Sequence, residues 1–289
     1  MSTIVTVILW CIVVLIILYL FMVMPRVIAR PDMRPFQKFL YAHRGLHDNN
    51  SDAPENSMAA FKKAVDAGFG IEMDVQLTKD RIPVVFHDFT LERVCGGEGK
   101  VYDYTYKELQ QFNLCGSGEK IPLFADVLKL VDGKVPLIIE LKIESTDAAV
   151  CPIADRILSD YKGLYCIESF NPFGLHWYRC NRGQIIRGQL SDAFLKLDEY
   201  RDSKGGERML YFALQNLLLN FLGRPDFIAY NHKYSYIFNR KLCRGLFRAR
   251  AAAWTIKSPE ELIEAEKHFD IFIFDSFVPE KIPKMNKNR

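Results

Sequence analysis

Short apolar runs that alternate with amphipathic stretches constrain the fold of this chain more than any other feature. We predict eight of these runs to be β-strands: Phe39–His43, Gly70–Val75, Leu137–Lys142, Tyr165–Ser169, Gln184–Gln189, Asp226–Tyr230, Ala251–Thr255 and Ile271–Phe274. Helical stretches lie between most of them: Asn56–Ala67, Phe124–Val131, Asp147–Asp160, Pro172–Cys180, Met209–Phe221, Tyr234–Gly245 and Pro259–His268. Eight strands joined by helices over about 250 residues predict the α/β class and a closed (β/α)8, or TIM, barrel. A doubly wound open sheet is the structural alternative.

The connection between the second and third predicted barrel strands is unusually long. Val75–Thr78 and Ile82–His87 flank a turn at residues 79–81. A tight turn makes its two arms antiparallel, so the second arm is not a barrel strand. We expect the following stretch, Cys95 to Lys120, to be a small insertion over the barrel mouth. Because barrels of this kind carry their chemistry at the carboxyl ends of the strands, the insertion bears on substrate choice.

An uncharged apolar run, Ile4 to Val23, opens the chain. About 20 helical residues at a rise of about 1.5 Å span roughly 30 Å of hydrocarbon. A cleaved signal peptide is the alternative, but residues 1–3 carry no Lys or Arg and no small-x-small cleavage site follows the run. We therefore predict a transmembrane anchor at residues 1–24, a basic, proline-containing linker at residues 25–38, and the barrel domain at residues 39–289.

The charges that follow the apolar run predict its orientation. Arg26, Arg30, Arg34 and Lys38 lie within the distance over which positive charge sets topology. We predict a single-pass membrane protein with its amino terminus outside and the barrel domain on the cytoplasmic side. Seven cysteines without a C-x-x-C pair agree with a reducing compartment. A formal charge of +3 gives no indication of a nucleic-acid partner, and the oligomeric state stays open.

Side chains that bind metals, protons or anions mark the carboxyl ends of the predicted strands. They are His43, Arg44, Glu72, Asp74, His87, Glu140 and Lys142. Alternate strand residues share a face, so Glu72 and Asp74 lie on one side. A half-exposed antiparallel strand would show the same alternation with solvated acids. Inside a barrel, however, crowded carboxylates repel one another unless a cation or protons intervene. Glu72, Asp74 and Glu140 would then form an all-oxygen site suited to Mg²⁺ or Ca²⁺.

Two histidines, His43 and His87, each end an apolar run. A single histidine at a strand end is usually structural, but a pair beside three acids can supply one base and one acid near neutral pH. Arg44 offers a planar fork of donors that matches phosphate oxygens. Taken alone, Arg44 is more simply interpreted as part of a surface ion pair.

These residues belong to motifs in which the chain resembles the glycerophosphodiester phosphodiesterase family. The motifs, in sequence order, are Tyr41–Gly45, Pro54–Ser57, Glu72–Val75, Pro83–Asp88, Ile139–Lys142, Ser169–Asn171 and Trp254–Thr255. The match extends over about residues 39–275, which is nearly the whole chain after the apolar run. The resemblance implies a TIM barrel that hydrolyses glycerophosphodiesters to glycerol 3-phosphate and an alcohol, with one divalent cation, Mg²⁺ or Ca²⁺.

The resemblance also implies a role for each matched residue. It makes His43 and His87 the acid–base pair, Glu72, Asp74 and Glu140 the metal ligands, Arg44 and Lys142 phosphate contacts, Glu55 a residue at the metal's edge, and Phe170 and Trp254 pocket-lining aromatics. Ile256-Lys257 replaces a common Val-Asn, and Phe269–Ser276 replaces a Gly-rich strand that ends in Thr-Asp. These departures bear on the specificity for the alcohol and glycerol groups, not on the reaction.

Two other functions stay open. A lysophospholipase D, or a phosphodiesterase acting on membrane glycerophospholipids, would exploit the tether, and Met209–Leu222 is apolar enough to lie at an interface. A helix packed on the barrel is the simpler interpretation of that stretch. An inactive membrane-tethered binding module is disfavoured, because every proposed catalytic position holds a competent residue. The expected partners are thus a small-molecule or lipid phosphodiester and the membrane.

Overall fold

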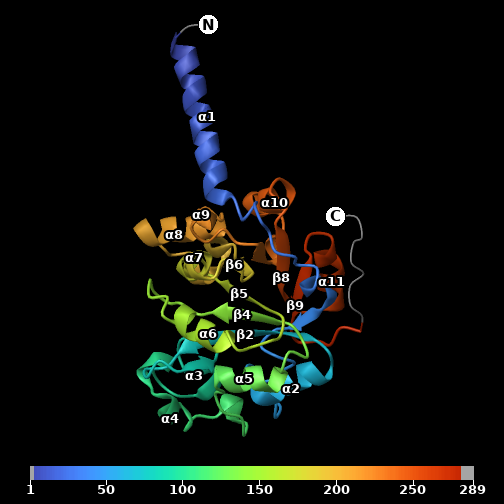
Figure 1. Ribbon diagram of the computed structural model, residues 1–289. Helices are drawn as coiled ribbons and strands as arrows, with labels where there is room; N and C mark the ends of the chain where they lie inside the picture. Colours follow the sequence, from blue (N-terminus) through green and yellow to red (C-terminus); the bar gives the residue numbers. More distant parts are fainter. Residues whose placement is uncertain (1–2, 281–289) are drawn as a thin grey trace.

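Eight parallel strands close into a barrel in the computed structural model, which describes residues 3–280 (Figure 1). The strands are β1 (Leu40–Ala42), β2 (Gly70–Leu77), β4 (Leu137–Leu141), β5 (Tyr165–Ser169), β6 (Arg187–Ser191), β7 (Phe227–Asn231), β8 (Arg250–Ile256) and β9 (Ile271–Phe274). β1 pairs with both β2 and β9, which closes the ring. The predicted (β/α)8 barrel is confirmed and the open doubly wound sheet is wrong. The strand predicted at Gln184–Gln189 begins later, because its pairing with β5 starts at Ile167 and Arg187.

Helices connect the strands and cover the outside of the barrel, except for α1, which precedes the barrel, and α3 and α4, which belong to the long connection after β2. They are α1 (Thr3–Val23), α2 (Met58–Asp66), α3 (Glu92–Cys95), α4 (Tyr106–Leu109), α5 (Phe124–Val131), α6 (Val150–Leu158), α7 (Pro172–Asn181), α8 (Gly205–Gln215), α9 (Asn220–Gly223), α10 (Phe238–Gly245) and α11 (Pro259–Glu266). Short 3₁₀ turns lie at Phe36–Lys38, Val101–Asp103, Leu114–Gly116, Phe194–Lys196, Asp198–Tyr200 and His232–Tyr234. Ser57 caps α2 by accepting from the Ala60 amide. The single helix predicted at Met209–Phe221 is wrong. α8 and α9 are separated at the buried Leu217, which has φ +56°.

The barrel interior is filled by alternate strand residues. On β4, Ile138 points into the inner cluster, while Ile139 belongs to the layer between sheet and helices. Glu140 therefore shares the inner side with Ile138, one step closer to the carboxyl end. Close packing inside demands small residues at some strand positions: a Cβ on Gly188 would lie 2.2 Å from the Phe227 ring. The barrel interior is therefore apolar at the level of Ile138 and acidic one step closer to the carboxyl end, at the level of Glu140.

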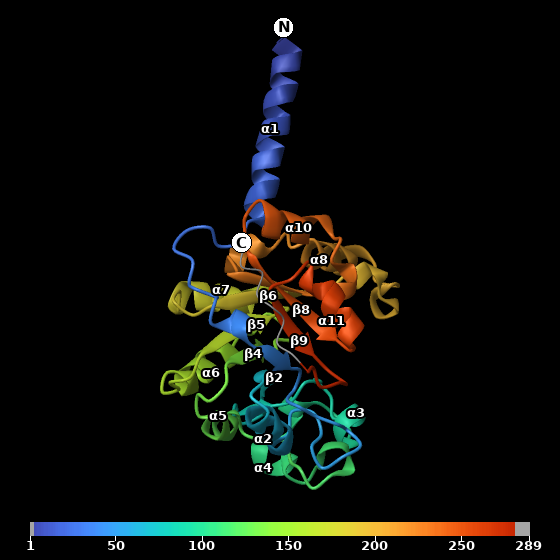
Figure 2. The same cartoon turned by 90° about the vertical axis from the view of Figure 1, so that its right-hand side faces the viewer.

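The long connection after β2 forms a separate small unit. β3 (Pro83–Val85) pairs antiparallel with β2, which confirms the predicted hairpin. The residues that follow form short helical turns around their own apolar cluster: Val84, Phe86, Leu91, Val94, Val101, Leu109, Leu114 and Ile121. α3 and α4 lie at the end of the domain opposite α1 (Figures 1 and 2). From this unit Arg93 reaches Glu55 beside β1, so the insertion contributes to the carboxyl rim of the barrel.

α1 is the one helix among residues 3–280 that is long and apolar enough to cross a membrane, with a mean hydropathy of 3.2. It projects from the domain, and its last turn packs on α9 and α10 (Figure 1). The Val23 carbonyl accepts from Asn220 Nδ2 at 2.8 Å and from the Cys243 thiol at 3.5 Å. The following segment lies along the barrel, with Phe36 fully buried. Residues 1–2 of the predicted anchor and residues 281–289 of the predicted barrel domain lie outside the described residues.

Candidate active site

An acidic cluster lies at the carboxyl end of the barrel interior. Glu72 and Asp74 alternate on β2, and the β2–β4 register sets Asp74 beside Glu140. One oxygen from each of these three carboxylates lies within 4.8 Å of the others, and all three side chains are buried. Acids far apart in the sequence therefore converge, as their strand-end positions predict.

The charge balance of the acidic cluster suits a cation. Burial, together with the charge of Asp74, raises the pKa of Glu72. Lys142 Nζ lies 3.0 Å from Glu140 and 3.7 Å from Asp74, and Arg44 Nε lies 3.7 Å from Asp74. Burial alone would raise the pKa of Asp74, but nearby positive charges, including that of Lys142, hold it well below its usual range. Even so, the buried Asp74 Oδ1 has no hydrogen-bond partner among residues 3–280. The donor set fits a divalent cation that takes oxygen ligands.

A fourth buried carboxylate, Glu168, escaped the sequence analysis. It lies on β5 opposite Glu140, is 1% exposed, and its Oε2 has no hydrogen-bond partner in the described part of the chain. Burial and the charges of Glu140 and Asp74 raise its pKa well above the usual value. An acid at the carboxyl end of a predicted strand was the signal that could have found it.

His43 lies directly after β1 and contacts the far end of the chain. Its Nδ1 lies 3.3 Å from Asp275 Oδ2, and His47 Nε2 lies 3.3 Å from the other oxygen of Asp275. Burial, reinforced by the positive charge of Arg44, lowers the pKa of His43 to about 4. His43 is therefore neutral at pH 7 and able to accept a proton. Sequence reasoning missed Asp275 and His47, although Asp275 directly follows the last strand.

A continuous set of ion pairs joins His87 to Arg44. His87 Nδ1 lies 2.6 Å from Asp88 Oδ1, and Arg93 contacts both oxygens of Asp88. Arg93 also donates to both oxygens of Glu55 at 2.7 Å, and Arg44 Nη1 donates to Glu55 at 2.6 Å. Arg93 was not predicted, because its position in the insertion gives no indication that it folds back to the rim.

A cavity of about 790 Å³ opens at this rim. Its polar lining includes His43, Arg44, His47, Glu55, Arg93 and Asp275. Phe170, just past β5, contacts Trp254 edge to face at 5.6 Å between ring centroids. From Phe170 a series of aromatic contacts continues through Phe194, at 6.0 Å, to Tyr211 on α8, at 5.7 Å. The acidic and basic groups of the rim thus lie at one end of the barrel, and the aromatic contacts continue from Trp254 to α8.

Known proteins support the family resemblance. Residues 43–169 match the sequence model of the glycerophosphoryl diester phosphodiesterase family. The human "Glycerophosphodiester phosphodiesterase 1" is 35% identical over 277 residues, which cover 84% of this chain and 79% of that protein. The chain therefore belongs to the glycerophosphodiester phosphodiesterase family.

Bacterial relatives and solved structures extend the comparison. The glycerophosphodiester phosphodiesterase of Caldanaerobacter subterraneus is 36% identical over 146 residues, which cover 46% of this chain and 58% of that protein. The chain spans about half the length of the bacterial relatives that it matches. An Oleispira antarctica phosphodiesterase, solved with sn-glycerol-3-phosphate, shares the fold with a TM-score of 0.63 at 23% identity and covers 82% of this chain and 92% of its own. A Thermotoga maritima glycerophosphodiester phosphodiesterase has a TM-score of 0.60 at 24% identity and covers 82% and 93%.

Proposed function

We propose that the chain hydrolyses glycerophosphodiesters to glycerol 3-phosphate and an alcohol in a reaction that requires a divalent cation. The observation that carries this proposal is the convergence of Glu72, Asp74 and Glu140 within 4.8 Å at the barrel's carboxyl end. Two histidines at the same end, each beside its own carboxylate, add acid–base groups. Family membership supports the same reaction.

Each group has a defined task in this reaction. A divalent cation held by Glu72, Asp74 and Glu140 would offset the negative charge of the phosphodiester. Arg44 and Lys142 supply further positive charge to the phosphate oxygens. His43, which is neutral at pH 7, deprotonates the nucleophile, either water or the substrate's own 2-hydroxyl. His87 protonates the leaving alkoxide.

Hydrolysis of glycerophosphocholine by the full chain tests this proposal. Release of glycerol 3-phosphate is measured with added Mg²⁺, with added Ca²⁺ and with EDTA, which should abolish turnover. His43→Ala and His87→Ala should each lose roughly 10²–10⁴-fold in turnover with metal binding largely kept. Glu72→Ala should lose metal dependence as well. His176→Ala, which replaces an exposed histidine on α7, is the matched control. Wild-type rates in either catalytic histidine variant would overturn the assignment.

A lipid phosphodiester is the second candidate substrate. The aromatic series from Trp254 to Tyr211 leads to α8, where Met209 is 73% exposed and Phe212 is 52% exposed. An acyl chain can pack along such a path. Rates on lysophosphatidylcholine micelles and on soluble glycerophosphocholine separate the two substrates. Tyr211→Ser should slow hydrolysis of the lysolipid alone if the path holds the chain. Any hydrolysis that EDTA abolishes excludes an inactive binding module.

We infer that α1 is a retained membrane anchor, with residues 25–38 connecting it to a cytoplasmic barrel domain at residues 39–289. The basic residues after α1 and the seven free cysteines support this orientation. Cys180 is an exposed thiol of the barrel domain. A membrane-impermeant maleimide should label it only after the cells are lysed, with Cys180→Ser as control. Labelling in intact cells would contradict the cytoplasmic orientation. Release of the protein from membranes by carbonate would contradict the assignment of α1 as an anchor.

A further inference from the structure

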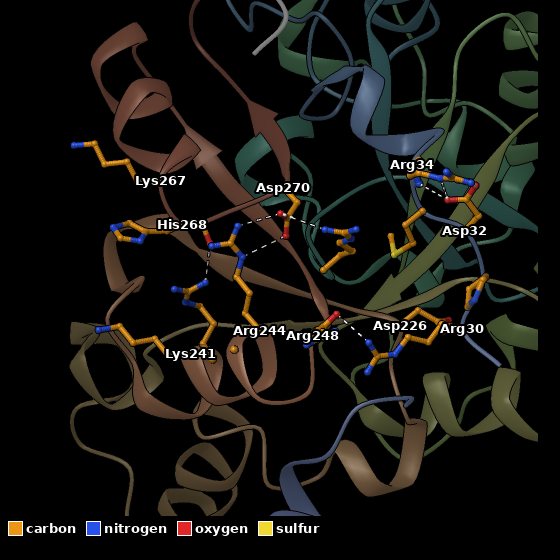
Figure 3. A pocket seen from close by; sticks show the side chains of 16 residues that line it. Arg30, Asp32, Arg34, Asp226, Lys241, Arg244, Arg248, Lys267, His268 and Asp270 are labelled. Carbon is orange, nitrogen blue, oxygen red and sulfur yellow. Dashed lines mark hydrogen bonds and ion pairs between the residues drawn. The ribbon is translucent and has the colours of Figure 1, made fainter. Parts of the chain in front are cut away.

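A second cavity, larger than the one at the carboxyl rim, lies at the amino ends of the strands, on the opposite side of the barrel from the acidic cluster. It measures about 1030 Å³ (Figure 3). Asp226 and Asp270, which directly precede β7 and β9, and Arg250, which opens β8, form its inner wall. α10 and residues 30–34 form its sides. No part of the proposed reaction uses this cavity.

Positive charge dominates the lining of this amino-face cavity. Eight arginine and lysine residues face three aspartates: Arg30, Arg34, Arg240, Lys241, Arg244, Arg248, Arg250 and Lys267 against Asp32, Asp226 and Asp270. The aspartates are already engaged, since Asp270 Oδ1 lies 3.0 Å from Arg244 and Asp32 pairs with Arg34 at 2.8 Å (Figure 3). Lys241 and Arg248 are exposed and have no ion pair among residues 3–280. The cavity therefore holds an excess of positive charge.

Burial, with a smaller contribution from mutual repulsion, disfavours the charged forms of two basic side chains in this cavity. Burial, followed by repulsion from Arg244, lowers the pKa of Arg240 to about 10. Burial and the charges of Arg250 and Arg248 likewise lower the pKa of Arg30. A bound anion would offset this repulsion by placing negative charge among the basic side chains.

The cavity lies next to the end of α1. The Val23 carbonyl contacts Cys243 on α10, and the same helix lines the cavity. Both views place α10 at the base of α1 (Figures 1 and 2). Phe238 at the start of α10 is 67% exposed, and Leu246 just past its end is 60% exposed. Exposed apolar side chains beside lysine and arginine are typical of a surface that meets lipid headgroups.

We propose that the amino-face cavity binds the phosphorylated headgroup of an anionic lipid in the leaflet that α1 enters. The excess positive charge of the cavity matches an anionic ligand. Its position beside α1 favours a lipid headgroup over a soluble phosphate. The proposal rests on the inferred membrane location and is independent of catalysis. Headgroup binding would fix the barrel against the bilayer by a second contact besides α1.

Lipid titration of the full chain in a neutral detergent tests this proposal. Binding of phosphatidylglycerol and of phosphatidylcholine is measured by native mass spectrometry in the presence of EDTA. The wild type should bind phosphatidylglycerol more tightly than phosphatidylcholine. Lys241→Glu/Arg248→Glu should weaken this binding by at least about 25-fold, because each basic residue near an anionic lipid contributes roughly fivefold. Lys107→Glu, an exposed lysine on α4, makes the same kind of charge reversal far from α1 and should bind like the wild type.

Several outcomes would overturn the proposal. Equal phosphatidylglycerol binding by the wild type and the double variant would place the lipid elsewhere. Equal competition by inorganic phosphate would identify a soluble anion, and tighter binding of a DNA oligonucleotide would identify a nucleic acid. Lys241→Gln/Arg248→Gln, which should also weaken binding, repeats the test if the charge reversal prevents folding. Glycerophosphocholine hydrolysis should be unchanged in the double variant, so loss of lipid binding and failure of the proposed reaction are seen separately.

Discussion

Replacement of Asp275 by alanine tests whether this carboxylate acts through His43. Asp275 holds His43 Nδ1 at 3.3 Å and leaves the other ring nitrogen free to accept a proton. A hydrogen bond to a charged group contributes about 1.5–3 kcal/mol. Since about 1.4 kcal/mol corresponds to tenfold in rate, Asp275→Ala should lower kcat by roughly 10- to 150-fold. His43→Ala should cost more, roughly 10²–10⁴-fold, because it removes the proposed base itself.

The assay couples release of glycerol 3-phosphate from glycerophosphocholine to the reduction of a nicotinamide cofactor and yields kcat and KM separately. Asp275→Asn keeps an acceptor oxygen and should recover part of the lost rate. The decisive variant is the double replacement His43→Ala/Asp275→Ala. If Asp275 acts through His43, the double variant loses no more than His43→Ala alone. Multiplied losses, or a wild-type kcat in Asp275→Ala, would refute the reasoning.

The pH dependence gives an independent readout of the same pair. Burial holds the pKa of His43 at about 4, below its ordinary 6.5, so this proposed base stays deprotonated across neutral pH. The acid limb of kcat/KM should therefore lie well below pH 6.5. Asp275 favours the protonated imidazole and so raises the pKa of His43. Its removal should shift the acid limb to still lower pH, and an upward shift would contradict this account.

Three further predictions concern the residues around the site. Glu168→Gln should weaken binding of Mg²⁺ or Ca²⁺ by roughly 10–100-fold in isothermal titration calorimetry, because a bound cation would favour the ionised form of this buried carboxyl beside Glu140, whose pKa is otherwise raised; unchanged affinity would make it purely structural. Arg93→Ala should lower kcat/KM by about tenfold, and Arg93→Lys should recover little, because lysine lacks the fork that clamps two carboxylates. Gly45→Ala should cost about 1–3 kcal/mol in the free energy of unfolding, because it combines φ +84° with a Cβ 2.9 Å from the Ala60 backbone. Gly68→Ala, with φ +75° but open space around its Cβ, should lower the melting temperature less.

The sequence predicted the barrel and its acidic centre because both depend on local patterns. Period-2 alternation on β2 orients Glu72 and Asp74, and parallel strands bring their carboxyl ends to one rim whatever their separation in the chain. The boundary errors arose where tertiary packing overrides local preference. Leu217 is one example, since its burial in the core accompanies the left-handed turn that ends α8.

Partners chosen by barrel closure were beyond the reach of local patterns. Asp275 pairs with His43 only because β9 returns to β1, and Arg93 reaches Glu55 only because the insertion folds back on the rim. The amino-face cavity is formed by residues 30–34, α10 and the segments before β8 and β9. Each of these segments carries ordinary surface charges, and only the folded structure shows that their positive charges cluster in one cavity.

The hydrogen bonds at Val23 have a mechanical consequence. The last carbonyl of α1 accepts hydrogen bonds from Asn220 and Cys243, which ties the end of the helix to the barrel. If α1 crosses a bilayer, a change in its tilt should change the orientation of the whole barrel domain relative to the membrane. The height of the barrel mouth above the lipid surface would then follow bilayer thickness rather than chain flexibility.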